Sequence, residues 1–348
     1  MPTTVTKTVK SSGGDYTSLL AWEAGEQGDL VAADEIRQAE CYAFFDDAGD
    51  AVMSGWTIDA TRYPRIFVAA GNQHDGTRGT GYRRQITGFE HNIDVLQDVL
   101  RVEGLAIESD NSSGQLGDRG FNIDCGASSD IRISKCYQTV GITNDNAFLR
   151  AFNSTGGVKV WNCMSGPPDL VSASRMQQID IAASGTFYLY NNTIVGNDLG
   201  AFSFCIGRSS GTPTIVSKNN VADRGASPDA NASAYQMSGA TTTGSTNNLS
   251  DDTSAPGSNP ITSASPVYVD ETNGDLHIGS SDAVCRDVGV DLSADANIAF
   301  SDDIDGTSRP QGSAWDVGAH EFFVAPWPPE GSDNAPEKLC IIQSGLRW

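Results

Sequence analysis

Short runs of alternating apolar and polar residues recur along the chain, and each run ends near a small or amide residue. They read LRVEGLAI at 100–107, IRISKC at 131–136, VKVWNC at 158–163, FYLYNNTI at 187–194, IVSKNNV at 215–221 and, more weakly, TGSTNNL at 243–249. A second series precedes most of them, at 121–125, 148–152, 179–183, 202–206 and 234–237. Alternation with period two predicts half-buried β-strands, and the Gly- and Ser-rich stretches between the runs predict turns.

The runs repeat at a nearly constant interval. Their ends are separated by 31, 27, 29, 28 and 28 residues, counted along Leu105, Cys136, Cys163, Asn192, Asn220 and Asn248. Helical repeats of this period would need amphipathic runs of about ten residues or more, and a β-sandwich would not keep a constant interval. The pattern therefore predicts an all-β parallel solenoid, in which each turn contributes two or three short strands.

Stacking of the turns gives the residues at the run ends a structural role. Equivalent positions in successive turns lie about 4.8 Å apart along such a coil. Cys136 and Cys163 would then stack inside the coil as small apolar groups. Asn192, Asn220 and Asn248 would form an amide ladder at a bend, where asparagine tolerates the left-handed conformation. The alternative is that these asparagines bind a sugar.

The two ends of the chain depart from the repeat. Residues 1–34 are expected to cap the coil with a short helix over 15–25, with Asp15 as N-cap and Gly25 as its end. The body is expected over 35–323, with irregular strands at 35–45, 51–58 and 66–70 before the regular period begins.

Residues 324–348 form a Pro-rich linker and an extended C-terminal tail with a cluster of apolar side chains. We predict that this tail docks on a partner or folds back to plug the coil. The candidate interaction residues are Trp327, Leu339, Ile341, Ile342, Leu346 and Trp348.

The charge limits the partners. With 22 basic and 44 acidic residues, the formal net charge is −22, which argues against nucleic acid as a partner. The one basic cluster, Arg78, Arg83 and Arg84, is interpreted as a polar loop. No apolar run approaches the roughly 20 residues of a membrane span, and the first residues lack the apolar core of a secretory signal.

Catalytic and metal-binding signatures are weak. Asp302, Asp303 and Asp305 resemble a calcium loop in miniature, but the 12-residue EF-hand frame is absent. The histidines show no metal-protease spacing and no nucleophile partner, and the seven cysteines form no CxxC pair, which predicts buried thiols. We therefore predict no metal, no cofactor and no catalytic residue. The histidines are His74, His91, His277 and His320.

Two sets of residues would serve a carbohydrate-active solenoid. A carboxylate pair on one lateral face could act as acid and base, and outward-facing aromatic rings could stack on sugars. The carboxylates are Asp124, Asp130, Asp145, Asp180 and Asp198, and the rings are Trp161, Tyr188 and Tyr190. The simpler interpretation is that these are solvated turn residues and packing residues.

Several segments resemble right-handed parallel β-helix proteins encoded in phages and prophages. They are GDYTSLLAWE at 14–23, GWTID at 55–59 and the NNTI-like turns. DIDG at 303–306, Arg309-Pro310 and WDVGAHE at 315–321 resemble the closing motif of bacterial and viral β-helix chains. The resemblance covers residues 5–323 and implies a right-handed coil. No catalytic motif of pectate lyases or polygalacturonases matches this chain residue by residue, so the expectation leans away from an enzyme.

The resemblance implies a virion structural protein, such as a capsid decoration, head fibre or tail component, anchored through a terminal segment. Its expected partners are other virion proteins, with a homotrimer as one option, and its expected place is the virion after assembly in the host cytoplasm. The alternative is a tailspike-like protein that binds or depolymerises host surface polysaccharide as a hydrolase or lyase. A cell-surface adhesin would need an export signal. Neither nucleic acid nor a membrane is an expected partner.

Overall fold

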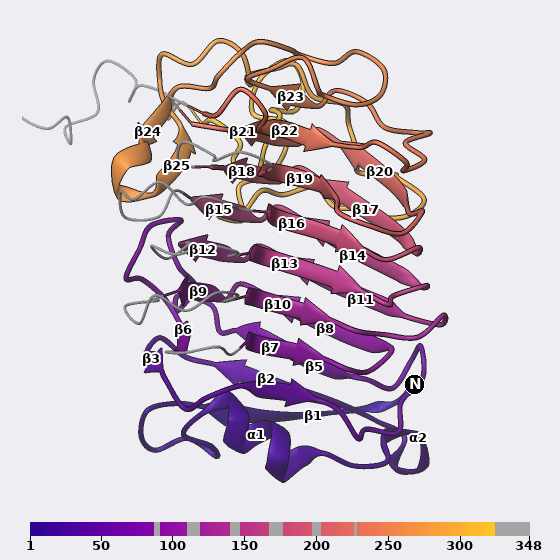
Figure 1. The fold of residues 1–348 in the computed structure, drawn as a ribbon. Coiled ribbons are helices and arrows are strands. Elements are labelled where there is room, and N and C mark those ends of the chain that lie inside the picture. Colours follow the sequence, from indigo (N-terminus) through magenta and orange to yellow (C-terminus); the bar gives the residue numbers. More distant parts are fainter. Residues whose placement is uncertain are drawn as a thin grey trace, which may run out of the picture.

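The computed structural model describes residues 1–86, 91–109, 119–139, 147–166, 177–196, 203–225 and 228–323 of the chain. Successive turns of the coil rise from α1 at one end to β23 at the other (Figure 1). Each turn passes through three parallel sheets, which we call sheets I, II and III. The predicted right-handed parallel β-helix is confirmed.

Sheet I contains β1 (Thr3–Val9), β2 (Glu35–Cys41), β5 (Pro64–Val68), β8 (Val99–Glu103), β11 (Asp130–Ser134), β14 (Gly157–Trp161), β17 (Thr186–Tyr190) and β20 (Thr214–Lys218). Sheet II contains β3 (Phe45–Asp46), β6 (Arg83–Ile86), β9 (Ala106–Ser109), β12 (Tyr137–Thr139), β15 (Met164–Gly166), β18 (Thr193–Val195), β21 (Val221–Asp223) and β23 (Leu249–Ser250). Sheet III contains β4 (Ala51–Met53), β7 (His91–Val95), β10 (Arg119–Ile123), β13 (Ala147–Phe152), β16 (Gln177–Ala182), β19 (Phe204–Arg208) and β22 (Ser233–Gln236).

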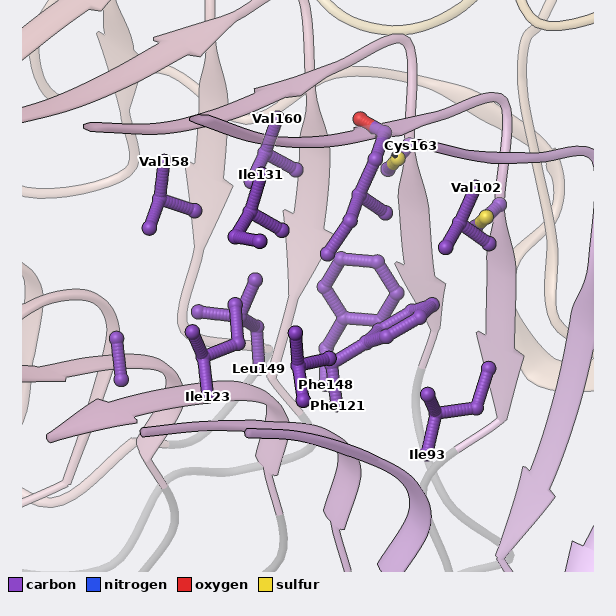
Figure 2. Packing of buried hydrophobic residues seen from close by; sticks show 14 of the residues in the cluster. Ile93, Val102, Phe121, Ile123, Ile131, Phe148, Leu149, Val158, Val160 and Cys163 are labelled. Carbon is purple, nitrogen blue, oxygen red and sulfur yellow. Dashed lines mark hydrogen bonds between the residues drawn. The ribbon is translucent and has the colours of Figure 1, made fainter. Parts of the chain in front are cut away.

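The interior is filled by matching positions of successive turns. Ile131 pairs in register with Val158, and Val158 with Phe187, so one inward column repeats along sheet I. Figure 2 shows Phe121 and Phe148 of sheet III rising toward the side chains of sheet I, with ring centroids 5.6 Å apart and edge to face. Burial of these apolar columns is the main stabilising contribution to the coil.

Sheets I and II meet at a sharp bend with two adjacent columns of residues. The inner column contains Cys136 and Cys163, both fully buried, and the predicted asparagine ladder. Asn220 Oδ1 accepts from Asn192 N at 2.9 Å, and Asn248 Oδ1 accepts from Asn220 N at 3.2 Å. The inward cysteine stack and the amide ladder are therefore confirmed.

The left-handed backbone belongs to the outer column, one residue earlier, so its assignment to the ladder asparagines is wrong. The outer residues all have positive φ: Gly104, Lys135, Asn162, Asn191, Asn219 and Asn247. This bend also splits the predicted runs in two, because Gly104, with φ +81°, ends β8 before β9 begins.

A short helix covers the first turn, as predicted. Helix α1 (Leu19–Glu26) is capped by Ser18, whose side chain accepts from Ala21 N, and it is followed by α2 (Leu30–Ala33). The predicted N-cap Asp15 is wrong, because its carboxylate instead accepts from Thr8 N and Oγ1, both at 2.9 Å. Residues 1–34 also supply β1, the first strand of sheet I.

The last part of the described chain turns back onto the coil. After the hairpin of β24 (Tyr268–Asp270) and β25 (Asp275–Ile278), with the 3₁₀ turn η1 (Glu271–Asn273) between them, residues 288–321 run along the bend. We call this segment the strap. Outer-column amides donate to its carbonyls: Asn247 to Val288, Asn219 to Val290, Asn191 to Gly318 and Asn162 to Asp302. The predicted tail, 324–348, lies outside the described residues.

Candidate ligand-binding groove on sheet I

Four cations form a column on the outer face of sheet I. Arg65 pairs in register with Arg101, Arg101 with Arg132, and Arg132 with Lys159. Their apolar neighbours in the strands, such as Val102 and Ile133, point inward and are buried. Alternation therefore places the four cationic side chains on one face of adjacent turns, whose strands lie about 4.8 Å apart.

Two carboxylates pair with these four cations among the described residues. Glu103 lies 2.8 Å from Arg65. Asp130 lies 2.6 Å from Arg101, 2.9 Å from Arg132 and 3.5 Å from Lys159. Burial opposes the charged form of Asp130, but Arg132, Arg101 and Lys159 hold its pKa below the usual value. The column therefore keeps an excess of positive charge on a chain of net charge −22.

Aromatic rings lie beside the cations. The guanidinium of Arg101 lies 4.7 Å from the ring centroid of Tyr63, and Lys159 lies 6.0 Å from that of Tyr188. Trp161 stands in the neighbouring outward column, in register with Tyr190. The predicted rings Trp161 and Tyr188 are partly exposed, whereas Tyr190 is buried beneath the strap. Only the first two can thus meet a ligand.

Two neighbouring hollows lie between sheet I and the strap. The first, of about 360 Å³, is lined by three cations of the column, by Tyr63 and Trp161, and by Phe300 and Asp302 of the strap opposite. The three cations are Arg65, Arg101 and Arg132. The second, of about 410 Å³, is lined by His74, Asp75 and strap residues 304–306. Glu103 and Lys135 line both hollows, so we treat the two together as one groove.

Ion pairs fix the strap wall of this groove. Lys135 Nζ lies 2.6 Å from Asp302. His277 of β25 lies between two carboxylates, with Nδ1 2.5 Å from Asp275 and Nε2 3.0 Å from Asp305. Burial lowers the pKa of His277, but Asp305 and Asp275 outweigh it and raise the pKa to about 9. His277 is therefore an imidazolium at neutral pH.

His277, Asp305 and His320 each place one potential ligand atom within 4.8 Å of the others, as a metal site would. Their hydrogen bonds favour a proton instead. Both nitrogens of His277 face carboxylates, and His320 Nδ1 already accepts from Ile278 N at 3.0 Å, which leaves its proton on Nε2. A metal would have to displace the His277 proton and turn the His320 ring.

Sequence reasoning missed this grouping. His74, His277 and His320 are far apart in the sequence, and the His74 ring lines the second hollow with Asp305. The DIDG and WDVGAHE segments could have signalled it, because each contributes one residue to the cluster. Their partner His277 lies outside both segments.

The acidic residues singled out in the sequence have separate positions. Asp303 is fully buried and accepts from the backbone of Asp305, Thr307 and Glu321, so it orders a turn of the strap. Asp130 lies on sheet I. Asp180 lies on sheet III, 3.0 Å from Arg150.

The remaining carboxylates complete no pair within the described residues. Asp124 follows β10 at the end of sheet III, and Asp145 and Asp198 lie outside the described part of the chain. The three described carboxylates of the predicted set, Asp124, Asp130 and Asp180, are therefore divided between sheet I and sheet III.

The other predicted sites have mixed outcomes. Six cysteines are described, and all six are free and buried, as predicted. Arg84 does not lie in a polar loop: it is fully buried in β6 and pairs with Asp46 at 2.8 Å. The candidate interaction residues Trp327, Leu339, Ile341, Ile342, Leu346 and Trp348 lie outside the described residues.

The helices of the described part of the chain are too short and too polar to cross a bilayer. Neither a protein-family model nor a curated protein nor a solved structure matches this chain.

Proposed function

We propose that the protein binds an anionic polysaccharide along the groove of sheet I. The observation that carries the proposal is the column of Arg65, Arg101, Arg132 and Lys159 on four adjacent turns. Stacking four cations costs free energy, and the two paired carboxylates offset only part of it. A ligand with repeating negative charge would offset the rest.

The groove suits sugars for two further reasons. Arginine forks bind carboxylate or sulfate groups in a bidentate manner, and the repeat of the column can follow a polymer along the coil axis. The flat rings of Tyr63, Trp161 and Phe300 line the same hollow and offer apolar faces for pyranose rings. The polymer would lie across several turns and bind through many weak contacts.

The resemblance to phage β-helix proteins supplies a setting for this binding. In that setting the chain is a virion component that contacts the polysaccharide of its host, and the tail anchors it to other virion proteins. The anchoring residues lie outside the described part of the chain, so this assignment stays a prediction.

Binding can be tested with alginate as a polyuronate, and with dextran sulfate and dextran as an anionic and neutral pair. We expect the chain to bind alginate and dextran sulfate but not dextran, with an affinity that falls as salt is added. The variant Arg101→Gln/Arg132→Gln should lose about tenfold or more in affinity, because each charge-assisted bond contributes about 1.5–3 kcal/mol. Affinity electrophoresis and calorimetry measure both effects.

Arg208→Gln is the matched control. Arg208 lies at the end of β19 on sheet III, and its guanidinium donates to the carbonyls of Gly211 and Ser238. Equal losses in the two variants, or no binding by the native chain, would refute the groove assignment. New reducing ends in the polymer would add a depolymerising activity to the proposed binding.

A further inference from the structure

His277 links three parts of the molecule. It lies in β25, its Nε2 faces Asp305 of the strap, and its ring lies edge to face with His320 at a centroid distance of 4.7 Å. A Cβ placed on Gly76, in the loop after β5, would meet the His277 ring at 2.3 Å, so that loop also packs closely against it. The ring therefore has little freedom to turn away from its two carboxylates.

The strap loop held by His277 is a wall of the groove. Ile304, Asp305 and Gly306 line the second hollow, and Asp302 lines the first. Asp305 reaches His277 from the exposed side of this loop, with about a third of its side chain accessible to water. Without a cation opposite it, the Asp305 carboxylate would turn to solvent, and the loop would lose its ion pair with β25.

We infer that His277 is a positioning residue for the groove: its imidazolium clasps the strap loop against β25 and so keeps the wall of the second hollow in place. This inference rests on the proposed function for the role of the groove, but not for the clasp itself. The clasp holds only while His277 carries both ring protons.

The groups around His277 set the pH at which the clasp opens. Asp275 faces it from its own strand, Asp305 and His320 from the strap, and His74 from the loop after β5. Asp75 of the same loop acts on His74. The two nearest carboxylates hold the proton on His277 beyond neutral pH, and the folded pKa is about 9. The folded pKa exceeds the unfolded one, so the stabilisation is complete below about 6.5 and is lost as the pH rises through 9.

The first test needs no ligand. Ring resonances of His277 in the full chain should report an imidazolium at pH 7 and titrate near pH 9. In Asp305→Asn the same resonances should titrate at a lower pH, because one of the two charges is gone. In His277→Gln, amide exchange over 302–307 should be about tenfold faster. A neutral His277 at pH 7, or unchanged exchange in His277→Gln, would overturn the clasp.

His91→Gln is the matched control, because His91 also pairs with a carboxylate, Asp94 at 2.8 Å, but lies on sheet III. It should leave exchange over 302–307 unchanged. The second test is alginate affinity. At pH 7 it should be at least about fivefold lower in His277→Gln than in the native chain, and unchanged in His91→Gln. In the native chain it should fall at least about fivefold between pH 7 and pH 10.

The two proposals fail separately. If the His277 resonances and the amide exchange behave as expected but the native chain binds no alginate, the proposed function is wrong and the clasp stands. If the native chain binds and Arg101→Gln/Arg132→Gln weakens it, while His277→Gln changes neither exchange nor affinity, the clasp is wrong and the proposed function stands.

Discussion

His320 is a neutral histidine held next to a charged one. Burial and the positive charge of His277 lower the pKa of His320 to about 3. Its Nδ1 keeps the bond from Ile278 N only while that nitrogen carries no proton. The stability that His320 contributes to the strap is therefore lost as the pH falls, whereas the stability that the clasp contributes is lost as the pH rises.

The sign follows from proton linkage. Between pH 6.5 and 3, the unfolded chain binds a proton on His320 and the folded chain does not, so the stability that His320 contributes is lost as the pH falls. We expect His320→Gln to lack this loss. The difference in unfolding free energy between the native chain and the variant should shrink by about 1 kcal/mol per pH unit on acidification. Urea unfolding at pH 7, 6, 5 and 4 measures it.

Comparison with the variant is needed because two buried acids act in the opposite direction. Burial raises the pKa of Asp303 and of Asp316 to about 6, so their contribution is complete below 3.8 and is lost as the pH rises through 6. Asp303 and Asp316 contribute equally to the native chain and to His320→Gln, so their contributions cancel in the difference between the two unfolding free energies. A difference that stays constant from pH 7 to pH 4 would contradict the assignment of His320.

At the scale of elements, the amide ladder joins successive turns at the bend. Asn220 is fully buried, and its side chain donates to Leu189 O at 2.5 Å and accepts from Asn192 N at 2.9 Å. The ladder thereby supplies side-chain partners to buried backbone groups of the turn below.

Asn220→Ala should be strongly destabilising. It removes the partners of the Asn192 N–H and the Leu189 carbonyl inside the protein, at roughly 1–3 kcal/mol for each unsatisfied group. We expect a lower urea midpoint, corresponding to a loss of roughly 2–6 kcal/mol. Asn231→Ala, in an exposed turn, is the control and should change stability by less than about 0.5 kcal/mol. Similar losses in both variants would contradict the ladder's role.

The ladder also marks the limit of what the sequence could predict at this scale. The spacing of Asn192, Asn220 and Asn248 predicted the ladder, because a solenoid repeats its chemistry with its turns. It did not predict that the residue before each would take the left-handed conformation, since adjacent asparagines offer two candidates for one bend. The bonds from that outer column to the strap could not be predicted at all, because the strap does not repeat.

The groove illustrates the same limit. The strands of sheet I were largely predicted, but the cation column was not, because Arg65, Arg101, Arg132 and Lys159 become neighbours only once the register of four turns is known. The opposite wall comes from residues 300–306. In the sequence this segment showed only acidic residues like those of a calcium loop, without the EF-hand frame.

For the whole molecule, the coil is closed at both ends. Helix α1 packs at the β1 end, with Leu19 and Trp22 in the core, and residues 241–261 continue the last turn through isolated bridges. Covered ends keep the open edges of three sheets from pairing with other copies. Any attachment of this body to a larger particle must then use a lateral face or a terminal segment.

The sequence predicts that the tail, residues 324–348, is the terminal segment that docks on a partner. Its removal tests this prediction directly. We expect a chain lacking 324–348 to keep its far-ultraviolet spectrum and melting temperature, because the coil and strap are complete at residue 323. Incorporation into particles should be abolished, as measured by protein analysis of purified virions. Unchanged occupancy would rule out anchoring by the tail, and loss of folding would show that the tail belongs to the coil.

The strap has a consequence for the order of synthesis. Lys135 and Asn162 find their partner, Asp302, more than 130 residues later in the chain, and Asn191 finds Gly318. A solenoid can otherwise form turn by turn as it leaves the ribosome, since each turn contacts only its neighbours. Here the outer-column asparagines of the middle turns lack their strap partners until residues 302–318 have been synthesised. The fold at the bend is thus complete only once the strap has been synthesised. A product truncated before residue 302 should therefore be cleaved by proteases along the bend.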